Sequence, residues 1–156
     1  MQVIKAPENR PNDDTIKVFM GGSIEMGKAE DWQTRLANYF KDNNTVTFWN
    51  PRRDDWDSSW EQDPTEGTQF HEQVQWELDA QDDADYIVYY FDPETQAPIT
   101  LLELGSYGSQ NAKNVIVCCP DGYFRKGNVV MFCNHHDIKI VDTFNELVDE
   151  LAKIII

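Results

Sequence analysis

The sequence has few basic residues and no long apolar run, and each shortage excludes a class of protein. Thirteen Lys and Arg stand against 28 Asp and Glu, which gives a net charge of −15 over 156 residues. Such a field repels DNA, RNA and anionic membranes, so we expect neither polymeric nucleic acid nor a membrane as partner. No stretch approaches the roughly 18 consecutive apolar residues of a membrane helix. A small anion held locally by an arginine is compatible with this charge.

Cysteines are also scarce, and their spacing does not suit a disulfide framework. Cys118, Cys119 and Cys133 make an odd number without CxxC spacing, and the first two lie in the apolar run "NVIVCC". This is typical of reduced core cysteines. His135 and His136 follow in "CNHH", but side chains this close in sequence rarely bind one ion together, so we expect no metal site. The N-terminus lacks the basic start and apolar run of a secretory signal, and we expect a cytoplasmic protein.

What the sequence does contain is an alternation of apolar strands and helices. Residues 1–15 are polar and carry prolines, so we expect a loose arm ahead of a single domain, residues 16–156. Strands are expected at residues 16–20, 45–51, 85–91, 114–120 and 138–143, and helices at residues 28–42, 70–84, 99–112 and 144–155. Strands without polar alternation are buried on both faces. We therefore expect a flavodoxin-like or Rossmann-like α/β domain, doubly wound around a five-stranded parallel sheet.

In such sheets, ligands bind at the carboxyl ends of the strands. Candidate substrate-binding residues follow three of the expected strands: Gly21, Gly22, Ser23 and Ile24; Asn50, Arg52 and Arg53; Asp92 and Pro98. "GGSI" is either an ordinary tight turn or an open backbone that binds a ribose or phosphate. The adjacent arginines either pair with the aspartates that follow them or bind a ligand anion.

Glu103 lies in "LLELGSYG", in the first turns of the helix expected after the third strand. Thr100 and Glu103 match a capping box, in which the glutamate reaches back to the start of its own helix. In the alternative interpretation, the helix dipole keeps Glu103 ionised and its carboxylate points into the ligand crevice. An ionised carboxylate in a dry crevice can attack the anomeric carbon of a sugar.

Glu77 is the second candidate acid, on the helix before the third strand. Phe70, Val74 and Leu78 form the apolar face of this helix, and Glu77 lies at its edge. Most acids on such a stretch belong to a solvated face. Across a pocket from Glu103, however, Glu77 could act as general acid or base beside the nucleophile.

The chain resembles the nucleoside 2-deoxyribosyltransferase superfamily, and within it a transferase-like family related to deoxynucleoside 5′-monophosphate N-glycosidases. The resemblance lies in "VFMGGSI", "FWNPRRDDWDSSWEQ", "QVQWELDAQDDADYIVYYF", "PITLLELGSYG" and "RKGNV". It implies that Glu103 is the nucleophile and that Glu77, eight residues before Asp85, assists the departing base. It further implies that Gly21, Gly22 and Ser23 hold the sugar, and that a polar residue of a neighbouring subunit, here Asn128, completes the site.

Two positions depart from the pattern of the well-studied transferases. A tyrosine that contacts the nucleophile falls at Phe19, and an aspartate that binds the base falls near Ala97 and Pro98. These departures favour a substrate other than the plain nucleosides.

The resemblance implies an enzyme that cleaves the N-glycosidic bond of a 2′-deoxyribonucleoside or its 5′-monophosphate through a glycosyl-enzyme on Glu103. The deoxyribose then passes to another base or to water, without a cofactor, in a homodimer or larger oligomer with a shared active site. The alternative is a non-catalytic nucleotide-binding or sensor module on the same fold. A third interpretation is a purely structural acidic protein, but it gives no role to the motifs "ELG" and "GGSI".

Overall fold

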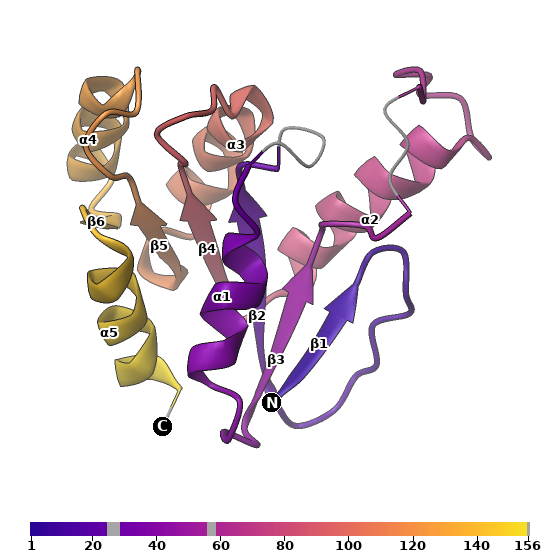
Figure 1. Ribbon diagram of the computed structural model, residues 1–156, viewed down its shortest axis with the longest axis horizontal. Helices are drawn as coiled ribbons and strands as arrows, with labels where there is room; N and C mark the ends of the chain where they lie inside the picture. The colour runs from indigo at the N-terminus through magenta and orange to yellow at the C-terminus, as the bar shows by residue number, and fades with distance from the viewer. Residues whose placement is uncertain (25–28, 56–58, 156) are drawn as a thin grey trace.

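The computed structural model describes residues 1–24, 29–55 and 59–155, which form a parallel sheet of six strands between two helical layers (Figure 1). The strands are β1 (Gln2–Lys5), β2 (Ile16–Gly22), β3 (Val46–Asn50), β4 (Tyr86–Tyr90), β5 (Val115–Cys118) and β6 (Lys139–Val141). The helices are α1 (Trp32–Tyr39), α2 (Gln69–Asp83), α3 (Pro98–Glu103), α4 (Lys126–His135) and α5 (Phe144–Ile154). A π-helical turn, η2 (Leu104–Gly108), continues α3, and a 3-10 turn, η3 (Ala112–Asn114), precedes β5.

The strand order is β1-β3-β2-β4-β5-β6, and every pair is parallel. Without β1 this is the flavodoxin-like order, which confirms the expected doubly wound α/β fold. The sixth strand comes from the segment expected to be a loose arm, since Gln2 lies opposite Thr47 and Lys5 opposite Asn50. Only Val3 and Ile4 mark β1 in the sequence, and two apolar residues are too few to show a period.

Two separate cores lie on the two faces of the sheet. Helices α1 and α5 cover one face, with Trp32, Leu36 and Leu147 fully buried. Helices α2, α3 and α4 cover the other face (Figure 1), where Tyr89 and Leu104 are buried among apolar side chains. The order in which strands are added to the sheet reverses between β2 and β4, so their carboxyl ends flank the crevice in which such sheets bind ligands.

Helix α2 exists as predicted, but a different face of it is buried. The sequence pattern assigned Phe70, Val74 and Leu78 to the core, yet the buried residues are Gln73, Trp76, Ala80 and Gln81, and Leu78 is 38% exposed. Gln81 can be buried because both ends of its amide are hydrogen-bonded, and Gln73 Nε2 donates to the Pro51 carbonyl at 2.7 Å, although Gln73 Oε1 has no partner. A pattern of apolar residues does not register such contacts.

Helix α3 begins three residues earlier than the capping box requires. Pro98 is its first residue, Ala97 precedes it in the left-handed region with φ of 47°, and no side chain caps it. Thr100 is a buried residue inside the helix, so the predicted capping box of Thr100 and Glu103 is wrong. Proline at the first position explains the start, because its fixed φ suits a helix and its missing N–H is not needed there.

A full helix, α4, replaces the loop with a short helical piece that we expected between residues 121 and 136. Within the residues that the structure describes, no helix combines the length and apolar character needed to cross a membrane.

Candidate active site

Glu77 and Glu103 come together where α2 packs beside α3. Both side chains are half-buried. The contact between the helices is direct, because the Tyr107 hydroxyl of η2 donates to the backbone carbonyl of Leu78 at 3.2 Å. The two acids therefore lie on neighbouring helical segments that contact each other, and their division of roles stays a prediction.

Both carboxyl groups hold their protons more tightly than ordinary glutamates. Burial raises the pKa of Glu77 to about 8, and repulsion from the Glu103 carboxylate adds to this rise. Burial raises the pKa of Glu103 to about 7, against a hydrogen bond from Gln81 that lowers it. The prediction that a helix dipole keeps Glu103 ionised is thus wrong in its cause, since Glu103 ends α3 rather than beginning it. Near neutral pH the pair holds about one proton, which suits one nucleophile and one acid.

Gln81 is a site residue that the sequence did not reveal. It lies in the last turn of α2, 3% exposed, and its Nε2 donates to the Glu103 carboxylate and to the Glu77 carbonyl at 3.1 Å. Its Oε1 accepts from the Tyr89 hydroxyl at 2.6 Å. In the sequence, Gln81 belongs to an acidic run that reads as a solvated face. Its only signal is the four-residue spacing from Glu77, which places both on one side of a helix.

Gly21 and Gly22 are required by packing. A Cβ at Gly21 would lie 2.8 Å from the Tyr89 ring, and one at Gly22 would lie 2.4 Å from the Tyr90 carbonyl oxygen. Both contacts are shorter than any side chain tolerates. These glycines therefore allow β2 and β4 to meet closely at the edge where the predicted ligand crevice opens.

Ser23 joins the ends of β2 and β4. Its hydroxyl accepts from the backbone N–H of Asp92 at 3.0 Å and from the Thr95 hydroxyl at 2.7 Å, and it is 1% exposed. The Asp92 carboxylate turns away to accept from the Glu94 backbone N–H at 2.9 Å. Ser23 and Asp92 are thus brought together, and the Ser23 hydroxyl fixes the two loops to each other.

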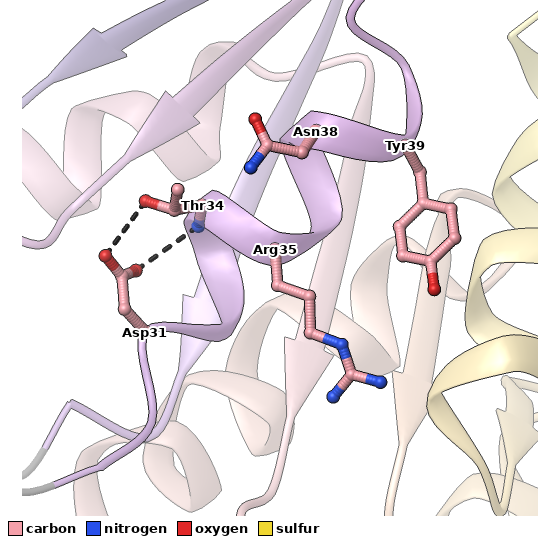
Figure 2. A pocket seen from close by; sticks show the side chains of 5 residues that line it. All are labelled: Asp31, Thr34, Arg35, Asn38 and Tyr39. Atoms are coloured by element: carbon pink, nitrogen blue, oxygen red, sulfur yellow. Dashed lines mark hydrogen bonds between the residues drawn. The ribbon is translucent and has the colours of Figure 1, made fainter.

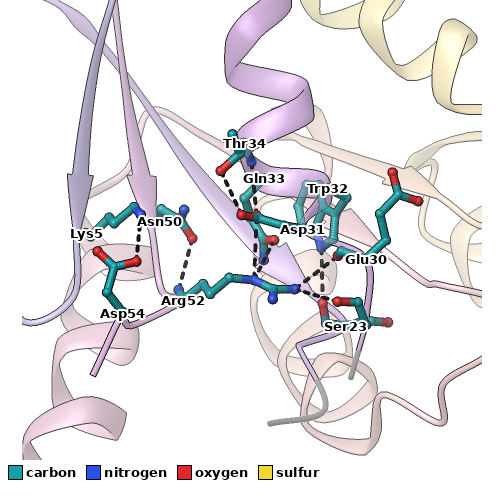
Figure 3. Close-up of polar contacts among 11 residues, drawn as sticks. Lys5, Ser23, Glu30, Asp31, Trp32, Gln33, Thr34, Asn50, Arg52 and Asp54 are labelled. Carbon is teal, nitrogen blue, oxygen red and sulfur yellow. Dashed lines mark hydrogen bonds and ion pairs between the residues drawn. The ribbon is translucent and has the colours of Figure 1, made fainter. Parts of the chain in front are cut away.

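Arg52 fastens the segment after β2 to the end of β3 (Figure 3). Its guanidinium donates to the carbonyls of Ala29 at 3.2 Å and Glu30 at 3.0 Å, and to Oε1 of Gln33 at 3.3 Å. Its backbone N–H donates to Asn50 Oδ1 at 2.9 Å. The Arg52 side chain is thus paired internally, with Ala29, Glu30 and Gln33 rather than with the aspartates that follow it in the sequence.

Arg53 is also paired internally. Its guanidinium contacts both carboxylate oxygens of Asp55, at 2.9 and 3.0 Å, and Oε1 of Glu72 at 2.9 Å. These hydrogen bonds raise the pKa of Arg53 and lower the pKa of Asp55. The side chain is 4% exposed, so a ligand anion could reach it only by displacing a carboxylate.

The other predicted site residues lie apart from this network. Ile24 is half-buried just beyond β2, Pro98 is exposed at the start of α3, and Asn128 is exposed on α4. Phe19 is buried in the same core cluster as Tyr89. Among the described residues, no group of three His, Cys, Asp or Glu side chains is arranged as metal ligands, and the cysteines are unpaired and buried.

Two surface hollows lie away from the paired carboxylates. One, of about 500 Å³, runs along the outer side of α1 and is lined by Asp31, Thr34, Arg35, Asn38 and Tyr39 (Figure 2). The other, of about 870 Å³, lies at the opposite edge of the sheet from the loops above, beside Arg10, Lys17 and Asp85. Neither position is the carboxyl edge at which a doubly wound fold binds its ligand.

Residues 15–123 match the family described as "Nucleoside 2-deoxyribosyltransferase like". The match spans more than half of the chain, so this protein belongs to that family, and both Glu77 and Glu103 lie within the matched residues. No curated protein matches the sequence. Among solved structures, a conserved protein from Enterococcus faecalis V583 is 12% identical, with a TM-score of 0.61 over 89% of this chain and 98% of that chain. At this identity the likeness concerns the fold alone.

Proposed function

We propose that the protein cleaves the N-glycosidic bond of a 2′-deoxyribonucleoside through a covalent intermediate on Glu103. The observation that carries this proposal is the pair of Glu77 and Glu103, held half-buried on neighbouring helices with both pKa values raised. Two coupled carboxyl groups that share about one proton can divide the roles of nucleophile and acid. Membership of a nucleoside 2-deoxyribosyltransferase-like family supports the choice of substrate class.

The reaction has two halves. First, a Glu103 carboxylate oxygen attacks C1′, the C1′–N bond breaks, and its electron pair leaves with the base, which takes the proton of Glu77. A second base or a water then attacks C1′, and the bond to Glu103 breaks with its electron pair returning to the carboxylate. Glu77 takes the proton of the attacking group, which restores the starting state.

The nucleoside is the first substrate to test, ahead of its 5′-monophosphate. Arg52 and Arg53 were the candidates for binding a phosphate, and both guanidinium groups already hold carboxylate or carbonyl partners. Replacing those partners with a phosphate would leave acids such as Asp55 and Glu72 unpaired. Neither arginine therefore favours a phosphate over a hydroxyl at the 5′ position.

A second copy of the chain is proposed to complete the site. Leu78, Ile99 and Leu102 lie on α2 and α3 around the paired acids, and they are 38%, 60% and 69% exposed. Apolar side chains gathered next to a half-buried site are typical of a subunit contact. Asn128, exposed on α4, stays our candidate for the residue supplied across that contact.

The test is intact-mass measurement after mixing the protein with deoxynucleosides and their monophosphates, followed by acid quenching. The wild type is expected to gain the mass of one deoxyribosyl unit, or to release free base. Glu103→Gln should form no adduct and lose at least about 1,000-fold in base release, because the amide is not a nucleophile. Glu66→Gln, in an exposed loop, is the matched control and should behave as the wild type.

Ligand binding without adduct or base release, in the wild type and Glu103→Gln alike, would contradict the proposal. That result would leave a nucleotide-binding module in which Glu103 has only a structural role.

A further inference from the structure

Gln81 makes contacts that a residue placed only for packing does not need. It is almost fully buried, yet it lies between the hydroxyl of Tyr89 on β4 and the carboxylate of Glu103 on α3. The bond to the Glu77 carbonyl is local, since it joins residues four apart on one helix. The two remaining contacts cross between three different elements of the fold.

The Tyr89 hydroxyl determines which way the Gln81 amide faces. Burial raises the pKa of Tyr89, so its hydroxyl stays protonated and acts as the donor. Only the Oε1 of Gln81 can accept that proton, since the amide nitrogen has no acceptor capacity. The Nε2 group is consequently turned toward Glu103, where its N–H meets a carboxylate oxygen.

An N–H donor at this position favours the ionised form of Glu103. Burial raises the pKa of Glu103, and the hydrogen bond from Gln81 acts in the opposite direction. The donor also holds one carboxylate oxygen, Oε2, which restricts the orientation of the group. Ionisation and orientation are the properties that an attacking carboxylate needs.

We propose that Tyr89 and Gln81 form a positioning relay, in which Tyr89 orients the Gln81 amide and Gln81 holds Glu103 ionised and aimed for attack. This inference rests on the proposed function, because it assigns a role within the same reaction. Gln81 acts through the carboxylate of Glu103, and Tyr89 acts through Gln81, so both are positioning residues.

The ionisable groups that face Glu103 come from three elements. They are Glu77 on α2, Tyr89 on β4 and Tyr107 on η2, with Asp82 beyond Tyr107. Removal of the Gln81 amide leaves all of these groups in place. A change in the titration of Glu103 in such a variant is therefore a direct consequence of the lost donor.

The experiment measures base release between about pH 5 and about pH 9 for the wild type, Gln81→Met and Tyr89→Phe. The acid limb of the profile reports the ionisation of the nucleophile. Gln81→Met should move this limb upward by about one pH unit and lower kcat by roughly tenfold to a hundredfold, with little change in KM. Tyr89→Phe removes one oxygen and should shift the limb in the same direction by a smaller amount.

Gln75→Met is the matched control, because Gln75 is an exposed glutamine of α2 whose Nε2 donates to Asp79 at 2.8 Å. It should leave both the rate and the profile unchanged. The pKa of Glu103, followed by carbon NMR of labelled glutamate carboxyls without substrate, should rise in Gln81→Met and not in Gln75→Met.

The possible failures are distinguishable. A wild type that neither releases base nor forms an adduct overturns the proposed function, and with it the role of the relay. An active wild type whose acid limb and Glu103 titration are unmoved in Gln81→Met overturns the relay alone. Should Gln81→Met fail to fold, Tyr89→Phe decides the matter, since an unchanged profile in that variant contradicts the orienting role of its hydroxyl.

Discussion

Glu77 destabilises the folded chain at the pH at which it is proposed to work. Its pKa is raised in the fold to about 8 from an ordinary value of 4.5. Below pH 4.5, Glu77 is protonated in both the folded and the unfolded state, so its titration does not change the stability of the fold. As the pH rises from there through about 8, the unfolded state releases this proton first, so stability falls across that window.

Glu77→Gln is therefore expected to be more stable than the wild type at pH 8, by roughly 3–5 °C in Tm, and nearly equal to it at pH 4.5. Base release should fall by a factor of about 100 to 10,000, because glutamine cannot donate the proton to the leaving base. Thermal unfolding at the two pH values, with Glu66→Gln as control, checks the stability. A variant less stable than the wild type at pH 8 would contradict the raised pKa.

At the scale of single residues, the sequence indicates the two candidate carboxylates but not the side chains that hydrogen-bond around them. Glu77 and Glu103 could be found because their spacing from "AD" is a linear feature of the chain. Gln81 and Tyr89 could not, since their importance depends on a side chain of β4 meeting the last turn of α2. For Arg52 and Arg53, the sequence is compatible both with internal pairing and with anion binding. The positions of Ala29, Glu30 and Glu72 in the fold favour internal pairing.

At the scale of elements, the end of α4 is held in a conformation that suits glycine better than its present residue. Asp137 follows the helix with φ of 56°. Its N–H donates to the Asn134 carbonyl at 3.5 Å, and the N–H of Ile138 donates to the Cys133 carbonyl at 2.9 Å. This is the Schellman arrangement, whose left-handed residue is most often glycine.

Asp137→Gly should stabilise the protein by about 0.5–1 kcal/mol, because it relieves the left-handed conformation at an exposed position. Asp149→Gly is the control, since Asp149 is exposed in the interior of α5 and glycine there should destabilise by about 1 kcal/mol. Denaturant unfolding of the two variants should give shifts of opposite sign. Equal destabilisation by both would show that the Asp137 side chain contributes more than its backbone strain.

The long elements were predicted from their periods, whereas the short and the irregular ones were not. Strands β4 and β5 are continuous apolar runs, and such runs identify buried parallel strands. Strand β1 has only four residues, and its role as an edge strand depends on β3, more than 40 residues away. The start of α3 at Pro98 was misplaced because Thr100 and Glu103 imitate a capping box that the chain does not form.

At the scale of the whole molecule, the proposed shared site predicts an oligomer. Leu102→Glu should shift the protein toward monomer and lower base release at least about tenfold, since a charge would then lie in the apolar contact. Tyr39→Glu is the control, because Tyr39 is 53% exposed on α1, on the other side of the sheet. Light scattering after size exclusion checks the mass. A wild type that is monomeric at micromolar concentration would contradict the shared site.

The placement of β1 has a consequence for the order in which the chain folds during synthesis. Its residues are made before those of the other described strands, but Gln2 lies opposite Thr47, so the strand has no partner until β3 has been translated. Loop closure over that distance must also precede its pairing. Strand β1 therefore pairs only after β3 has been made, and until it pairs, the outer edge of β3 stays open to other chains.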